Sequence, residues 1–275
     1  LQTSYLYDHS TGKKYNLKYS IRLAVACMVI FTTTACNGIL DDIYDQPDKE
    51  IVAAKGQLVV DATSWTDWHY FDLKKLQRLA ESGDEEGLQK AQMEPETYPI
   101  PMTLTKESDG KSGQYMYWFD VFGEGITKSE FREFTPCDPQ EEPEEWTIAI
   151  HRNNVRTNGG AVLRTNCKSI AELPESSEAF DGMTFTEDEW SENDVWDGQE
   201  KMLLGLVPSQ GIKINRLLSS WLIVKVPPMP PEFSMDSRVF VLRLNDGTYA
   251  ALQLENYLSP QGEKCFMTIN YKYPY

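Results

Sequence analysis

The C-terminal part of the chain has the clearest alternation of apolar and polar residues. Residues 238–244 and 249–254 are two β-rich runs, and Asp246-Gly247 lies in the short turn between them. Asp-Gly between two such runs is a strong hairpin signal, because a tight turn needs residues that accept a positive φ. Residues 264–273 alternate in the same way and predict a final strand.

Several upstream segments also favour β-strands. The run 57–68 alternates and leads into the aromatic segment 65–71, and residues 114–121 are densely aromatic. Residues 146–151 form another short apolar run. β-branched and aromatic side chains fit the half-buried surface of a sheet, so we expect many strands joined by turns.

One segment has helical periodicity instead. Its leucines recur at helical spacing among good helix formers, which predicts an amphipathic helix at about 72–93, broken near Gly83. We interpret this helix as an insertion between the strands. The leucines are Leu73, Leu76, Leu79 and Leu88.

The N-terminal residues resemble an export signal. A cationic stretch leads into the apolar run 23–31, which is too short to span a bilayer permanently. Thr33-Thr34-Ala35-Cys36 then resembles a lipobox, in which Cys36 would be acylated, although Leu or Val is usual at the position of Thr33. The alternative is an ordinary secretion signal with an incidental cysteine.

These signals divide the chain into three predicted segments. Residues 1–35 are a leader and lipoprotein signal peptide, residues 36–55 a flexible tether, and residues 56–275 the folded domain. The pair Asp41-Asp42 resembles the acidic export tag of surface lipoproteins. We therefore expect an outer-membrane protein that is lipid-anchored and exposed at the cell surface, or released from it.

Charge and composition exclude some classes of function. The formal net charge is −16 and no compact basic patch is present, so nucleic acid is an unfavourable partner. The sequence has no G-x-S-x-G, H-E-x-x-H or phosphate-binding glycine loop, and we predict that it is not an enzyme. Cys137, Cys167 and Cys265 lack zinc-site spacing; an oxidising compartment permits one disulfide among them, with the pair left open.

Residues 146–161, Trp-Thr-Ile-Ala-Ile-His-Arg-Asn-Asn-Val-Arg-Thr-Asn-Gly-Gly-Ala, resemble the central signature of the HmuY family of the Bacteroidetes. Further segments follow in the family's order, and residues 65–71 fit its first strand. The resemblance covers roughly residues 57–275, but residues 72–145 are much longer than in the family and their role is open. The agreeing C-terminal segments are Trp221, 238–243, Asp246-Gly247, Asn256-Tyr257 and 268–273.

The resemblance implies an all-β fold of antiparallel sheets with few short helices. It also implies a lipid anchor and the delivery of haem to an outer-membrane receptor. Family members hold the iron with two axial side chains, a His pair in some and a Met pair in others. These ligands lie in two loops, one before and one after the Trp that matches Trp221.

The two corresponding loops contain Met202, within residues 199–205, and Met229, within 226–231. A thioether is a soft, uncharged donor that suits haem iron. The alternative for Met202 is a core position beside leucines, because Met commonly fills gaps. Met229 stands between two Pro pairs, which suits a rigid loop better than a regular core. The nearest substitutes are Met183 for Met202 and Met235 for Met229.

The histidines are weaker candidates. His69 and His151 both lie inside predicted strands, and we expect each to be a hydrogen-bonded structural residue.

Residues near the two methionines could line a slot for the macrocycle and meet its propionates. Such apolar residues are more often core, and such lysines are more often solvated. The expected lining residues are Trp196, Leu203, Leu206, Trp221 and Phe233, and the expected cations are Lys201, Lys213 and Arg216.

A second class of function stays open. The chain has 7 Trp and 14 Tyr, and such rings on a β scaffold can stack on sugars, as in a glycan-binding surface lipoprotein of a polysaccharide-utilisation system. A visible absorption band on addition of haem distinguishes the two classes.

Overall fold

The computed structural model divides into two units, Leu1–Ile51 and Val52–Tyr275. In the first, the backbones of β1 (Tyr5–Tyr7) and β2 (Lys14–Asn16) pair antiparallel. Cys36 lies outside the described residues. Within the described part of the chain, no helix combines the length and apolarity needed to cross a bilayer. Apart from β1 and β2, the structure describes residues 51–100, 113–133, 141–196, 198–199, 206–210 and 212–275.

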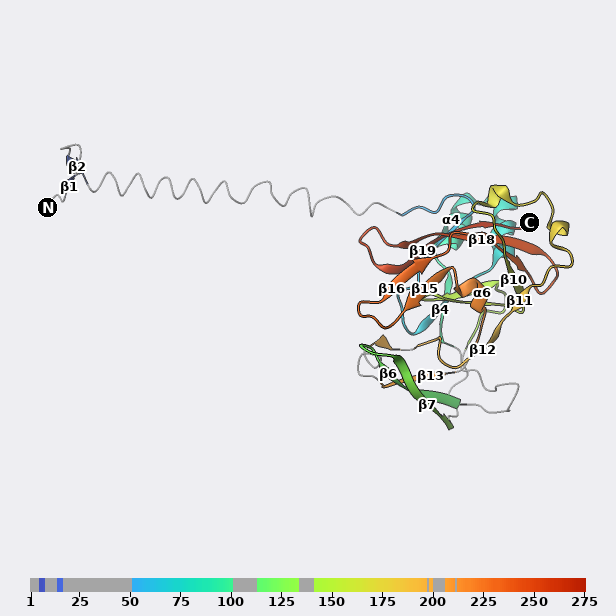
Figure 1. The fold of residues 1–275 in the computed structure, drawn as a ribbon. Helices are drawn as coiled ribbons and strands as arrows, with labels where there is room; N and C mark the ends of the chain where they lie inside the picture. The colour runs from blue at the N-terminus through green and yellow to red at the C-terminus, as the bar shows by residue number, and fades with distance from the viewer. Residues whose placement is uncertain are drawn as a thin grey trace. The chain divides into compact units, whose positions relative to one another are not determined.

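The largest sheet of the second unit has six strands in the order β11-β10-β17-β18-β19-β3. All neighbouring pairs are antiparallel, and β18 and β19 run side by side in Figure 1. The strands are β3 (Gln57–Asp61), β10 (Ala161–Arg164), β11 (Thr186–Glu187), β17 (Phe240–Arg243), β18 (Tyr249–Leu258) and β19 (Lys264–Lys272).

A second sheet has four strands in the order β5-β4-β8-β9, and a third has three in the order β13-β6-β7. Two further antiparallel pairs, β12-β14 and the β15-β16 ribbon, are separate two-stranded sheets. The strands of the larger sheets are β4 (Asp67–Phe71), β5 (Glu96–Pro99), β6 (Gly113–Asp120), β7 (Gly125–Glu133), β8 (Ile148–His151), β9 (Asn154–Thr157) and β13 (Leu206–Gln210). Those of the two-stranded sheets are β12 (Glu189–Ser191), β14 (Ile212–Ile214), β15 (Leu222–Lys225) and β16 (Glu232–Met235).

The predicted C-terminal hairpin is confirmed. Strands β17 and β18 pair with Arg243 opposite Tyr249, and Gly247 in the turn has a φ of 85°, which suits glycine. Alternation in β19 places Cys265, Met267 and Ile269 in the core, as expected for a strand with one buried face.

The predicted helical insertion is also confirmed, as two helices. α3 (Leu73–Ser82) begins at Asp72, whose carboxylate accepts from the Lys74 amide, and it ends at Gly83 with a φ of 73°. α4 (Glu85–Met93) follows directly and begins after Asp84. A short third helix, α6 (Arg216–Ser219), begins after Asn215. The all-β fold with few short helices is confirmed.

The principal core lies between the six-stranded sheet, the four-stranded sheet and the two inserted helices. Leu73 and Leu76 of α3 are fully buried in it. Trp221, which follows α6, is 0% exposed and meets Phe240 edge-on at 6.4 Å between ring centroids. Burying one such large apolar side chain contributes roughly 1.5–3 kcal/mol, so this core supports the strands that follow Trp221.

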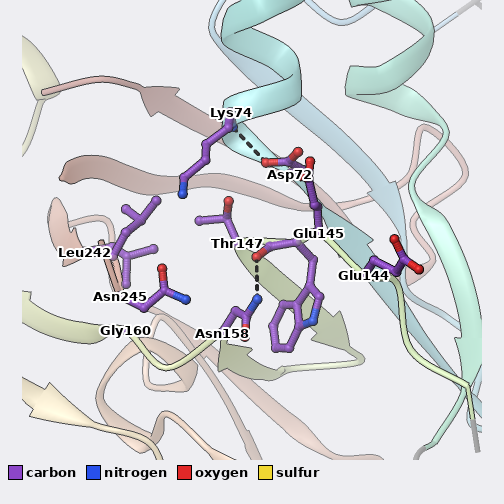
Figure 2. A pocket seen from close by; sticks show the side chains of 11 residues that line it. Asp72, Lys74, Glu144, Glu145, Thr147, Asn158, Gly160, Leu242 and Asn245 are labelled. Atoms are coloured by element: carbon purple, nitrogen blue, oxygen red, sulfur yellow. Dashed lines mark hydrogen bonds between the residues drawn. The ribbon is translucent and has the colours of Figure 1, made fainter. Parts of the chain in front are cut away.

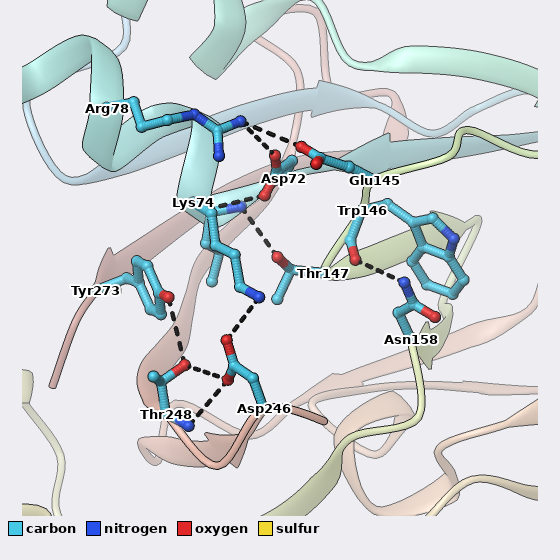
Figure 3. A network of polar contacts seen from close by, with 11 residues as sticks. Asp72, Lys74, Arg78, Glu145, Trp146, Thr147, Asn158, Asp246, Thr248 and Tyr273 are labelled. Carbon is cyan, nitrogen blue, oxygen red and sulfur yellow. Dashed lines mark hydrogen bonds and ion pairs between the residues drawn. The ribbon is translucent and has the colours of Figure 1, made fainter.

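A polar network ties α3 to the C-terminal hairpin (Figure 3). The Lys74 Nζ lies 2.6 Å from an Asp246 carboxylate oxygen, and Asp246 also accepts from the Thr248 amide and hydroxyl. The Arg78 guanidinium, one helical turn beyond Lys74, bridges Asp72 and Glu145. The ammonium of Lys74 is the largest cause that lowers the pKa of Asp246 below its usual range.

Replacing Asp246 by Asn should destabilise the fold by at most about 1 kcal/mol near neutral pH, because the ion pair is partly exposed. Because the pKa of Asp246 is lower in the folded chain, its carboxylate stabilises the fold at pH values above the unfolded pKa of about 3.9. This stabilisation is lost as the pH falls from that value towards the folded-state pKa. Urea unfolding at about pH 7 and about pH 3 should therefore show a difference between wild type and Asp246→Asn that shrinks in acid. An equal difference at both pH values, or an unchanged difference in a Lys74→Ala background, would contradict this.

Candidate functional site

A cleft of about 540 Å³ opens in the second unit, within the roughly 300–1,000 Å³ common for cofactor-sized ligands. Its sides come from segments far apart in the sequence. They are the approach to β4, the β6-β7 hairpin, the β8-β9 turn, the loop after β12, the β15-β16 ribbon and the turn before β19.

Aromatic rings form much of the cleft surface. The Trp196 ring meets Phe119 at 5.8 Å and Tyr117 at 5.6 Å between centroids, both in edge-to-face geometry. Trp65, Phe119, Trp196 and Met229 pack together around the buried Val121. The β6-β7 hairpin thus supplies one side of the cleft. This hairpin belongs to the segment 72–145, whose role the sequence left open.

Met229 reaches the cleft from the connection between β15 and β16. The ribbon pairs Lys225 with Glu232, which leaves residues 226–231 as a loop containing four prolines. Proline has no amide hydrogen, so these residues cannot extend the ladder. The loop also lies against the β6-β7 hairpin, since a Cβ on Gly125 would lie 3.5 Å from Pro227. Met229 is half-buried among the aromatic rings.

His151 borders the cleft but is 1% exposed. Its Nδ1 lies 2.9 Å from the Asp67 carbonyl oxygen and its Nε2 lies 3.1 Å from the Trp196 carbonyl oxygen. Burial lowers the pKa of His151 to about 4, because the charged imidazolium loses solvation. Both ring nitrogens therefore face backbone carbonyls, as expected for a structural histidine.

His69 lies outside the cleft lining. Its Nδ1 is 3.3 Å from the Thr97 hydroxyl, and burial lowers its pKa. Its Nε2 is buried without a hydrogen-bond partner among the described residues.

Two cations border the aromatic cleft, and the sequence analysis identified neither. Arg152 occupies the turn between β8 and β9 with a φ of 53°, and its guanidinium carbon lies 4.1 Å from the Trp65 ring centroid. Lys264 places its Nζ 4.5 Å from the Phe233 ring centroid. A sequence signal existed for Arg152, which stands directly after a strand in the 146–161 motif.

The structure brings together some of the sequence-predicted residues. Trp196, Met229 and Phe233 all line the cleft, whereas Trp221 is in the principal core and does not. Lys213 and Arg216 are also absent from the lining; Arg216 forms ion pairs with acidic residues near β12. Met202, Lys201 and Leu203 lie outside the described residues, and for Leu206 only the backbone is described.

The cysteine prediction is tested only in part. Cys167 and Cys265 are both free thiols, and Cys265 is buried in the core. Cys137 lies outside the described residues.

A smaller hollow of about 210 Å³ lies between the start of α3 and the chain around Asn158 (Figure 2). Its lining is largely polar and includes Lys74, Glu145 and Thr147. Because it is small and offers one indole, Trp146, it suits a large planar ligand less well than the aromatic cleft.

Comparison with known proteins gives one family. The model of the HmuY protein family matches residues 64–271. A search of curated proteins gave no match.

Several solved structures are similar to this chain. A protein from Bacteroides vulgatus described as an HmuY-like haem-binding protein is 27% identical, with 80% of this chain and 91% of that chain covered and a TM-score of 0.50. A protein from Bacteroides fragilis described as a lipoprotein is 26% identical, with 80% and 89% covered and a TM-score of 0.52. Apo PinO from Porphyromonas gingivitis is 18% identical, with 78% and 95% covered and a TM-score of 0.51, which shows a shared fold.

The buried His151 should make the fold less stable in mild acid. Its folded-state pKa of about 4 is below the unfolded value of 6.5, so between these values the unfolded chain binds the proton more strongly. As the pH is lowered from about 6.5 to about 4, the free energy of unfolding should therefore fall by about 3 kcal/mol at most. Urea unfolding across the window should show a shallower fall for His151→Gln, with His69 giving a residual slope of the same sign. Equal slopes in both proteins would contradict the assignment.

Proposed function

Because the family match covers residues 64–271, this chain belongs to the HmuY family, and we propose that its aromatic cleft binds haem through Met229 and Met202. The observation that carries the proposal is the thioether of Met229, which lies among Trp65, Phe119 and Trp196 in a cleft of cofactor size.

The chemistry of the cleft suits a flat, largely apolar macrocycle. Indole and phenyl rings on two sides offer apolar surfaces, and large apolar contact areas dominate the binding of such ligands. The Bacteroides vulgatus protein that matches most of this chain is described as haem-binding, which supports the same ligand here.

Met229 is our proposed first axial ligand. The thioether sulfur is a soft donor that stays neutral, so Met229 would hold the iron of a bound haem without adding charge to the cleft. The proline-rich loop holds few alternative backbone conformations, so little entropy is lost when Met229 binds the iron.

Met202 is our proposed second ligand. It stands three residues beyond Gln199, which lines the cleft, and a trans backbone covers at most about 11 Å in three residues. Four residues further on, Leu206 pairs with Trp118 beside the aromatic rings of the cleft. Both neighbours of the Met202 segment thus lie at or next to the proposed site.

Neither histidine offers a free nitrogen to the cleft. His151 would have to leave two backbone carbonyls, and His69 is not part of the lining. These contacts favour the Met pair over a His pair.

Arg152 and Lys264 are our proposed partners of the haem propionates. Each cation lies over an aromatic ring that lines the cleft, Trp65 and Phe233 respectively. A charge-assisted hydrogen bond to a carboxylate is about twice as strong as a neutral one, so these cations would orient the macrocycle. They replace Lys213 and Arg216, which are not in the lining.

The cellular role that we propose follows the family. The protein would be anchored to the outer membrane through Cys36, take up haem at the cell surface and pass it to an outer-membrane receptor. Support comes from the lipobox-like segment before Cys36 and from the match to a Bacteroides lipoprotein.

Replacing Met229 by Ala should remove one axial ligand. The low-spin absorption spectrum of the haem complex should disappear and affinity should fall at least about tenfold, roughly 1.4 kcal/mol. The matched control is Met235→Ala, because Met235 stands on the same ribbon, is 38% exposed and does not line the cleft. Absorption spectra of both variants with added haem measure the effect. An unchanged spectrum in Met229→Ala, or the same loss in Met235→Ala, would refute the ligand assignment.

Reduced haem should bind more tightly than oxidised haem, because thioether ligation favours the ferrous state. Binding should also change little between about pH 5 and pH 8, since thioethers do not titrate there and the pKa of His151 is about 4. Titration with haem before and after dithionite reduction, at several pH values, measures both effects. Affinity that collapses on mild acidification would favour a His ligand. Sugar binding without any haem absorption band would favour the glycan-binding alternative.

A further inference from the structure

The β15-β16 ribbon separates the aromatic cleft from another hollow of about 560 Å³. The ribbon pairs Val224 with Phe233 and Ile223 with Ser234, and successive residues of a strand point to opposite faces. Val224 and Phe233 line the aromatic cleft, whereas Ile223 and Ser234 line the other hollow, which we call the outer hollow. No residue lines both.

The outer hollow contains exposed apolar side chains. Ile223 is 51% exposed and Met235 is 38% exposed, and both line it. Ile223 lies on the face of the ribbon opposite Val224, and Met235 lines the outer hollow from the last position of β16. Exposed apolar surface inside a concavity is a feature of binding sites more than of ordinary protein surface.

The outer hollow also has an excess of positive charge in a protein of net charge −16. Arg238 donates from Nε and Nη2 to both carboxylate oxygens of Asp236, which satisfies this acid. Arg164 approaches the same carboxylate only to 3.9 Å, and Lys168 has no ion pair among the residues that the structure describes. Two cations therefore remain without a dedicated counter-charge.

Neutral donors surround these cations. The side chains of Asn166, Ser234 and Ser237 line the outer hollow and have no hydrogen-bond partner within the described ranges. A phosphate or carboxylate group has several acceptor lone pairs and matches this surplus of donors.

We propose that the outer hollow binds an anionic amphiphile, a molecule with a phosphate or carboxylate head and an adjoining apolar chain. The head lies between Arg164 and Lys168, and the chain lies over Ile223 and Met235. The proposal does not depend on haem binding, because the two sites share no lining residue.

Titration calorimetry with octyl phosphate below its micelle concentration tests the proposal, and inorganic phosphate in a parallel titration separates the head from the chain. Octyl phosphate should bind at least about tenfold more tightly than inorganic phosphate, a difference of roughly 1.4 kcal/mol. Arg164→Ala should weaken both ligands, whereas Ile223→Ser should weaken octyl phosphate alone.

The matched control is Lys225→Ala, which removes one positive charge from the same ribbon but outside the outer hollow. It should bind octyl phosphate like the wild type. Urea unfolding of Arg164→Ala, compared with the wild type, checks that the variant is folded. The proposal is overturned if octyl phosphate does not bind, if it binds no more tightly than inorganic phosphate, or if Lys225→Ala loses binding as strongly as Arg164→Ala.

Discussion

The contact on which the proposed site depends is the buried ring of His151. It lies at the end of β8 and places one nitrogen against the carbonyl of Asp67 and the other against the carbonyl of Trp196. The loop that carries Trp196 is thereby held against the four-stranded sheet, and the indole meets Phe119 of a different sheet. The neutral imidazole has a single N–H and donates to one of these carbonyls, so displacing the ring would leave that buried carbonyl without its donor and release one side of the cleft.

The β15-β16 ribbon depends on the principal core in a similar way. Trp221 is fully buried directly before β15, and its carbonyl accepts from the Asp236 amide directly after β16. The ribbon is thus held at its open end, while its proline-rich loop reaches the aromatic cleft. Because side chains alternate between the two faces of an antiparallel pair, Val224 and Phe233 face the proposed haem site and Ile223 and Ser234 face the outer hollow.

The long segment 72–145 has two structural roles where it is described. Its first part forms α3 and α4, whose leucines extend the principal core. Its later part forms β6 and β7, which carry Phe119 and Ile126 to the aromatic cleft. The same insertion therefore contributes both to stability and to the surface that we propose contacts haem.

The sequence by itself determined the local elements. The alternation in residues 264–273 identified β19 and its buried face, Asp246-Gly247 identified the hairpin turn, and the leucine spacing identified the helices. It could not distinguish Trp196, in the cleft, from Trp221, in the core, because both are indoles beside apolar residues. Nor could it reveal Arg152 and Lys264 as neighbours of the same cleft. Local periodicity indicates which face of a helix or strand is apolar. Only tertiary packing decides which other element that face contacts, because the residues that meet there are far apart in the chain.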